Sequence, residues 1–313
     1  MGNFIAYIIP TTIRMGTPIA FTALGGVVSE RSGVNNIGLE GIMLAGSFAA
    51  VLGSYLSGSP WVGVLVAMAI GVLISAIHSL LTITMGARQA VSSMALVLLA
   101  DGCCGVGLQS IWGQQGSSPQ VANLPDSPIF ANVPLVGSFL ASLSPFVYLA
   151  VLALLMVTFL FSYTRFGLRI SAVGENPAMA ATAGVNVHAV RYVSVLLSGA
   201  LGGLGGAMLS IGQMNLFQDG MIAGRGYLAL GAVQMGRWIP AGAFAASLVF
   251  GFFDALQLYV QTIPSNPIPS EFIQMLPYVA IIIILAASSK NIKYFGITAA
   301  GVPYTKYVQS QGE

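Results

Sequence analysis

The sequence predicts an all-α, polytopic membrane protein of about ten transmembrane helices. Charged residues make up only 6% of the 313 residues, hydrophobic residues make up 56%, and the mean hydropathy is +0.85. A soluble domain uses roughly 25% charged residues to cover its surface. Residues 41–87, 127–164 and 192–218 contain no Asp, Glu, Lys or Arg, and each run exceeds the roughly 18 apolar residues that indicate a membrane span. This composition excludes a soluble enzyme, a disordered chain and a nucleic-acid-binding protein.

Apolar runs bounded by polar, Pro or Gly residues define the candidate helices in chain order. The first two are short because Pro10 and Pro18 interrupt the run, and the last lies near the C-terminus. The Pro-rich segment 113–144 is expected to be an external loop. The apolar runs do not alternate as the strands of a membrane barrel do. The ten candidates are 3–15, 17–29, 37–57, 61–85, 90–112, 145–163, 191–214, 217–236, 240–261 and 271–289.

The basic residues predict the orientation, because Lys and Arg accumulate on cytoplasmic loops. With both termini inside, only Arg14 and Arg225 fall outside and the other nine basic residues fall on the cytoplasmic side. The segment 164–190 is then a cytoplasmic loop.

An internal duplication is suggested when the chain is compared with itself at an offset of 180 residues. Small residues four apart follow Pro60 as Gly63, Ala67, Gly71 and Ser75, and follow Pro240 as Ala243, Ser247, Gly251 and Ala255. Such a stripe lets another helix approach closely. We expect a single permease domain over 1–313, built as an inverted repeat of five plus five spans. Its halves would be 1–112 plus 145–163, and 188–289.

Polar residues within or near the spans are the candidates for a solute pathway, because burying them in a membrane is costly. The absence of a dense cluster of one charge favours an uncharged, hydrogen-bonding solute. These residues could instead form interhelical hydrogen bonds, ion pairs such as Glu30 with Arg31 or Asp219 with Arg225, or caps of the helix that starts near Ile37. The pathway candidates are Asn35, Asn36, Glu40, Gln213 and Asn215.

The sequence contains no constellation that predicts catalysis or metal binding. It has no phosphate-cradling Gly-x-x-x-x-Gly-Lys-Ser/Thr motif, and His78 and His188 have no ligand-spaced neighbours. Cys103 and Cys104 are adjacent in an apolar run and are expected to pack as small residues. We therefore expect a chain that is not itself an enzyme and holds no cofactor or metal ion.

Five motifs resemble those of the nucleoside permeases in bacterial ATP-binding-cassette (ABC) importers. Ser29-Glu30-Arg31-Ser32-Gly33-Val34-Asn35-Asn36-Ile37-Gly38-Leu39-Glu40-Gly41 is similar to the family's signature, and Asn36 departs from it because an apolar residue is usual there. Ribose-type and branched-chain amino acid permeases share the architecture. The other motifs are Arg165-Phe166-Gly167-Leu168-Arg169 with Val173-Gly174-Glu175-Asn176-Pro177, Gly224-Arg225-Gly226-Tyr227, Gly236-Arg237-Trp238-Ile239-Pro240 and Gln274-Met275-Leu276-Pro277-Tyr278.

The resemblance implies a multi-pass subunit of the bacterial cytoplasmic membrane. It implies a homologous second permease subunit as partner, an ATPase with two nucleotide sites that holds ATP and magnesium, and an external substrate-binding lipoprotein. The transported solute would be a nucleoside. The alternatives are a sugar or another small solute carried by the same architecture, or an ion-coupled carrier or channel.

The loop 164–190 contains the signals of a short helix that could contact the ATPase. Asn176 is a favourable N-cap, Pro177 suits the first helical position, and Gly184 can end the helix. A helix this short is marginal in water and needs a docking surface, unless the segment is only a solvated turn. The resemblance also implies a coupling helix here, and its candidate residues are Glu175, Asn176, Pro177, Ala178, Met179, Ala180 and Ala181.

Overall fold

The computed structural model describes residues 2–124 and 143–263, together with scattered positions between 269 and 304. Regular structure in this part of the chain is helical, apart from an isolated bridge between Ser117 and Gln218. Among the described residues, six helical segments are long and apolar enough to cross a membrane by length and composition. They are α2 (Leu39–Ser57), α3 with the π-helical turn η1 (Pro60–Thr84), α4 (Gln89–Trp112), α6 (Pro145–Tyr163), α9 with the π-helical turn η3 (Val187–Met214) and α11 (Pro240–Gln261).

The first two predicted helices are wrong, because residues 2–31 form one helix, α1 (Gly2–Arg31). Pro18 has no N–H to donate, which would leave the carbonyl of Arg14 without its helical partner. The side-chain Nε2 of Gln213 donates to that carbonyl at 2.7 Å, and Arg14 Nη2 donates in return to the Gln213 carbonyl at 2.8 Å. A neighbouring element thus replaces the hydrogen bond that proline removes.

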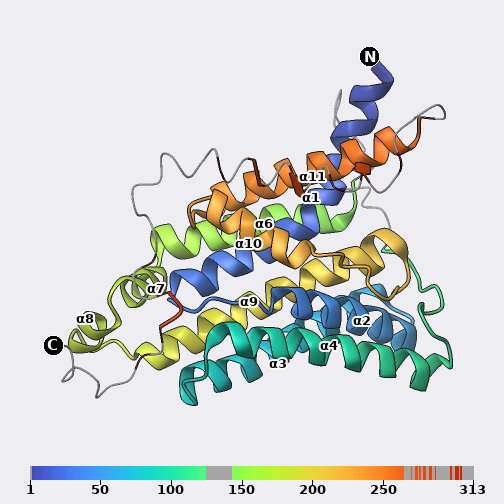
Figure 1. The fold of residues 1–313 in the computed structure, drawn as a ribbon. Helices are drawn as coiled ribbons and strands as arrows, with labels where there is room; N and C mark the ends of the chain where they lie inside the picture. The colour runs from blue at the N-terminus through green and yellow to red at the C-terminus, as the bar shows by residue number, and fades with distance from the viewer. Residues whose placement is uncertain are drawn as a thin grey trace.

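The continuous helix also changes the expected placement of the N-terminus. Thirty residues rise about 45 Å at roughly 1.5 Å each, so Gly2 and Arg31 lie at opposite ends of the bundle (Figure 1). The prediction that both termini lie on the cytoplasmic side depended on two spans within residues 3–29. Because these residues form one helix, the structure no longer supports that prediction.

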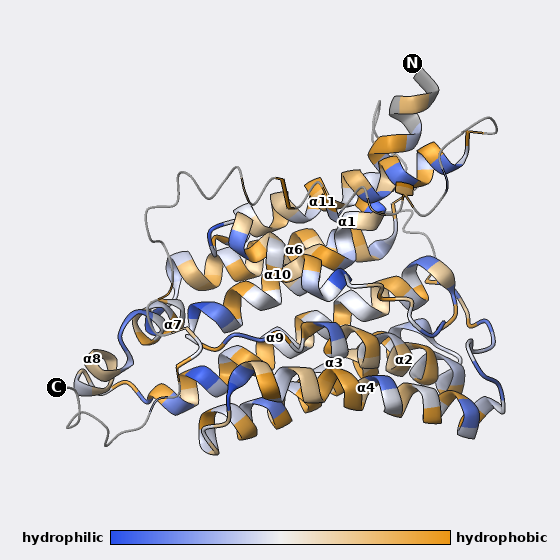
Figure 2. Cartoon of the chain, in the orientation of Figure 1, coloured by the Kyte–Doolittle hydropathy of each residue, from blue (hydrophilic) through white to orange (hydrophobic). Residues whose placement is uncertain are grey.

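The helices form a bundle in which α9 lies between two groups (Figure 1). Helices α2, α3 and α4 lie on one side, and α1, α6, α11 and the short α10 (Arg225–Met235) lie on the other. Orange hydrophobic segments run along the helices of both groups, as expected for a bundle that faces lipid (Figure 2). The five-plus-five order of spans stays a prediction.

Both small-residue stripes bring helix backbones into contact. A Cβ built on Gly71 of α3 would lie 2.2 Å from the Gly199 carbonyl oxygen of α9, and one built on Gly251 of α11 would lie 2.4 Å from Gly16 N of α1. An offset of 180 residues relates α3 to α11 and α1 to α9. The two contacts are therefore equivalent under the offset, which favours the proposed duplication.

Several predicted boundaries require correction. The span expected at 217–236 contains only α10, because Gly220, Ala223 and Gly224 have left-handed φ values of 70°, 49° and 79° and prevent a helix from forming before Arg225. The expected loop 164–190 contains two helices, α7 (Arg165–Glu175) and α8 (Pro177–Thr182). Most of the predicted helix 271–289 and residues 125–142 of the predicted external loop lie outside the described residues.

Candidate functional site

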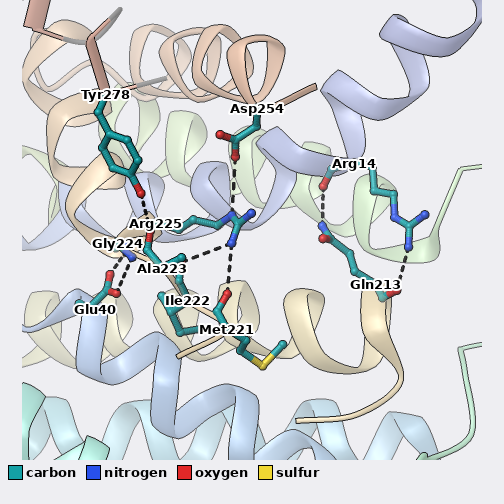
Figure 3. Close-up of polar contacts among 11 residues, drawn as sticks. Arg14, Glu40, Gln213, Met221, Ile222, Ala223, Gly224, Arg225, Asp254 and Tyr278 are labelled. Carbon is teal, nitrogen blue, oxygen red and sulfur yellow. Dashed lines mark hydrogen bonds and ion pairs between the residues drawn. The ribbon is translucent and has the colours of Figure 1, made fainter. Parts of the chain in front are cut away.

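The starts of two helices, α2 and α10, meet at Glu40. Residues 32–38 between α1 and α2 are not in regular helix, and Glu40 lies in the first turn of α2. Its carboxylate accepts hydrogen bonds from the backbone N–H of Gly224, at 2.9 Å, and of Gly226, at 2.7 Å, at the start of α10 (Figure 3). The first N–H groups of a helix have no helical acceptor and carry partial positive charge. Glu40 therefore holds the start of α10 against the start of α2.

The same turn of α10 carries an ion pair to a third helix. Arg225 Nε lies 3.7 Å from Asp254 Oδ2 of α11, and Arg225 Nη1 donates to the carbonyls of Met221 and Ile222 (Figure 3). Tyr278 donates its hydroxyl proton to the Ala223 carbonyl at 2.7 Å. The two ion pairs suggested by the sequence do not form. Arg225 pairs with Asp254 instead of Asp219, and Glu30 accepts a hydrogen bond from the indole N–H of Trp238 instead of pairing with Arg31. We call Glu40, Arg225 and Asp254 the charged junction.

Asn35 and Asn36 lie in the interruption that precedes the charged junction. The backbone N–H of Asn35 donates to Gln89 Oε1 of α4 at 2.7 Å. Asn36 is fully buried, and neither Oδ1 nor Nδ2 has a hydrogen-bond partner within the described residues. Buried amides are almost always paired with protein or with ordered water. Asn36 is therefore the polar group of this segment with unused hydrogen-bonding capacity.

Gln213 and Asn215 form a separate group at the other end of α9. Gln213 pairs with Arg14, as described above, and Asn215 ends η3 with a left-handed φ of 59° while its carbonyl accepts from Val121 N at 2.7 Å. A cavity of about 370 Å³ opens beside this group. Its polar lining is Thr11, Arg14, Asn123 and Ser144. The five pathway candidates thus lie in two places, with different partners.

The predicted capping of the short helix in 164–190 is confirmed. Asn176 Oδ1 accepts from Met179 N at 3.0 Å, Pro177 begins α8, and Gly184 has a left-handed φ of 82°. The candidate residues Ala178 to Ala181 were expected to form one exposed apolar face, and this is wrong at one position: Met179 is 68% exposed, but Ala180 is only 5% exposed and packs into the core. Met179 is therefore the large apolar side chain that α8 presents outward.

The end of α7 packs directly on the end of α1. A Cβ on Gly174 would lie 2.1 Å from the Arg31 carbonyl oxygen, so only glycine permits this approach. The Arg31 guanidinium lies 4.3 Å from the centre of the Phe161 ring, and the charge of Glu175 acts on it. Arg31 and Glu175 line a cavity of about 310 Å³ with Trp238. The motif residues of three distant segments meet here, which sequence spacing could not reveal.

Comparison with known proteins supports one family. The chain matches the model of the branched-chain amino acid transport system / permease component family over residues 8–285. It is 40% identical over 295 residues to the nucleoside ABC transporter permease protein NupC of Lactococcus lactis subsp. cremoris, covering 91% of this chain and 92% of that protein. It is 38% identical over 314 residues to the guanosine ABC transporter permease protein NupQ of Bacillus subtilis, covering 97% and 98%.

More distant similarities extend the comparison. A putative glucose ABC transporter permease protein of Haloferax volcanii is 34% identical over 267 residues, covering 83% of this chain and 80% of that protein. The two bacteria also have second permease proteins that resemble this chain, NupB and NupP, each 25% identical over 84% and 92% of it. The chain therefore belongs to the permease component family of the branched-chain amino acid transport system, among the permease proteins of ABC transporters.

Proposed function

We propose that this chain is the membrane permease subunit of an ATP-driven importer that carries nucleosides. The observation that carries the proposal is the 40% identity to a nucleoside permease protein across 91% of the chain. The charged groups that gather in the described residues are mixed in sign, and the lack of a dense cluster of one charge there agrees with an uncharged, hydrogen-bonding solute. Guanosine transport by the NupQ relative points to the same class of substrate.

The interrupted segment 32–38 and the charged junction support a role in the pathway. Irregular backbone at membrane depth is tolerated where it is buried in protein or lines a cavity. Glu40 fixes two helix starts against each other, and the unpaired amide of Asn36 offers one donor group and one acceptor. In this proposal Asn35, Asn36 and Glu40 control the solute pathway. Gln213 and Asn215 lie beside its outer opening.

The segment of α7 and α8 supports a role in contacting the ATPase. The outward Met179 and the intermediate exposure of Ala178 and Ala181 give α8 a small apolar face. Gly174 and Glu175 link this segment to α1, which runs the length of the bundle. The helix seated on the ATPase would therefore pass its displacement to α1. This end of the bundle would be cytoplasmic.

The complete importer would contain partners that carry out the remaining steps. A second, homologous permease is favoured because two bacteria each contain two permease proteins that resemble this chain. The ATPase would hold ATP and magnesium, and an external lipoprotein would deliver the nucleoside. A sugar is the second candidate cargo, favoured by the 34% identity to a putative glucose permease protein.

Reconstituted vesicles test the proposal. The complex of both permeases and the ATPase, supplied with its binding protein, should take up radiolabelled guanosine or adenosine only when ATP is present. Uptake should survive ionophores that collapse proton and sodium gradients. Vesicles in which this chain carries Met179→Asp are the control, because that chain should insert into the membrane but no longer bind the ATPase. Uptake of glucose without uptake of any nucleoside would refute the substrate, and uptake without ATP would refute the importer.

A further inference from the structure

Helix α4 carries a charge at the centre of its span. It contains 24 residues, and Asp101 lies near its midpoint, about 18 Å from either end at roughly 1.5 Å per residue. The hydrocarbon core of a bilayer is about 30 Å thick. Asp101 is exposed on the surface of the chain, and no described residue forms a hydrogen bond or ion pair with its side chain.

The residues around Asp101 form one continuous face. We define the α4 face as Met94, Leu98, Asp101, Gly105 and Gln109, whose spacing places them on one side of a helix. All five are exposed, and a Cβ on Gly105 would meet no atom within 4 Å. Helix α4 lies at the edge of the bundle, with its outer side uncovered by other labelled helices (Figure 1).

The exposed side of α6 differs from the α4 face in the chemistry of its side chains. The exposed side of α6 carries large apolar residues, including Leu152, Leu155, Met156 and Phe159, as expected for contact with lipid. The α4 face instead combines a carboxylate, a glycine and an amide. A charge at the bilayer centre is rare and faces a bundle interior, a water-filled cavity or a partner. Small residues at such a face let a second helix approach closely.

We propose that the α4 face is the docking surface for the second permease subunit, which supplies a hydrogen-bond donor or cation to Asp101. The inference rests on the proposed function, in which two homologous permeases pair, and it names the surface that joins them. The partner's chemistry follows from the face: a membrane helix with small residues for close approach and a basic or amide side chain at mid-span. Contact with Gly105 brings the backbones together, and Asp101 fixes their relative register.

Thiol labelling distinguishes a protein partner from lipid or water. In a Cys103→Ser background, in which the other native thiol, Cys104, is buried, single cysteines are introduced by Leu98→Cys on the α4 face and by Val106→Cys beside it. Both side chains are well exposed, at 73% and 67%. Membrane vesicles containing the full chain alone or the assembled complex are treated with a membrane-permeant maleimide and with a charged, water-soluble methanethiosulfonate.

The proposal predicts that assembly lowers maleimide labelling of Leu98→Cys at least fivefold and leaves Val106→Cys within twofold. Equal maleimide labelling of Leu98→Cys in both preparations would show that assembly does not cover the face and would overturn the proposal. Rapid labelling of Leu98→Cys by the charged reagent in the complex would also overturn it, because the face would then line an aqueous path.

A second measurement does not depend on labelling. Gly105→Trp should reduce recovery of the second permease on a tagged chain at least tenfold, whereas Val106→Trp should leave recovery within twofold. Equal recovery with the two variants would contradict the proposal. Neither experiment depends on the cargo, so glucose transport would refute the proposed substrate and leave the docking surface standing.

Discussion

Glu40 offers the sharpest test of how the starts of α2 and α10 are held together. Its carboxylate accepts two backbone N–H groups of α10, at 2.9 and 2.7 Å. Glu40→Gln keeps one oxygen acceptor but presents an NH2 group to the other N–H, so one of the two bonds is lost. Glu40→Ala removes both bonds.

The expected magnitude follows from these contacts. A hydrogen bond to a charged group contributes about 1.5–3 kcal/mol net, so Glu40→Gln should lower the free energy of unfolding by about 1.5–3 kcal/mol. Glu40→Ala should lower it by about 3–6 kcal/mol on the same basis. In a chain of this size 1 kcal/mol corresponds to about 2 °C in Tm. The expected decreases in Tm are therefore about 3–6 °C for Gln and about 6–12 °C for Ala.

Thermal unfolding of the detergent-solubilised complex measures the effect, with Asp219→Asn as the matched control. Asp219 is an exposed carboxylate whose side chain forms no hydrogen bond or ion pair within the described residues, so its change should stay within about 0.5 kcal/mol. The same variants should show reduced nucleoside uptake per assembled complex. A Tm for Glu40→Gln equal to that of Asp219→Asn would refute the assigned contacts. Unchanged uptake with lowered stability would restrict Glu40 to a structural role.

Three further outcomes are expected. Met179→Asp should abolish recovery of the ATPase with the chain while membrane insertion stays normal, and Met179→Leu should retain it; full recovery with the aspartate would remove α8 from the interface. A double-mutant cycle of Asp254→Asn and Arg225→Gln should give a coupling energy of about 1–3 kcal/mol, whereas additive effects on Tm would show that the pair contributes nothing. Gly71→Ala should destabilise the chain by about 1–3 kcal/mol, because its Cβ would lie 2.2 Å from a carbonyl oxygen; Ala69→Leu on the exposed side of α3 is the control, and equal Tm values would contradict the close packing.

The sequence was sufficient where a local signal decides the structure. Asn176, Pro177 and Gly184 act within one turn of the chain, and the structure has the cap at 3.0 Å that they predict. The span 240–261 matches α11 at both ends for the same reason, since Pro240 begins a continuous apolar run. Composition together with long apolar runs that do not alternate predicted an all-helical membrane protein.

The sequence failed where distant residues decide the structure. Pro18 locally favours a break, but α1 stays continuous because Gln213, far along the chain, donates to the carbonyl that proline leaves unpaired. Glu40 was identified as a pathway candidate, but its partners at Gly224 and Gly226 depend on tertiary packing. Glycine at position 226 does carry a signal, because a side chain there would collide with Glu40. That signal becomes readable only once the two helix starts are known to meet.

The backbone contacts between α3 and α9, and between α1 and α11, limit which parts of this protein can move. At Gly71 and Gly251 the neighbouring helix lies where a Cβ would stand, so rotation of either helix about its own axis would drive adjacent side chains into the facing carbonyl groups. The two helices of each pair must therefore move together as one rigid unit. Displacement at the α7 end of α1 is then carried along the whole of α11 as well, and Asp254 moves with it. The two pairs are also in backbone contact with each other, because a Cβ on Gly25 of α1 would lie 2.7 Å from the Ser198 carbonyl oxygen of α9. A displacement at the α7 end of α1 therefore reaches α9 and α3 as well.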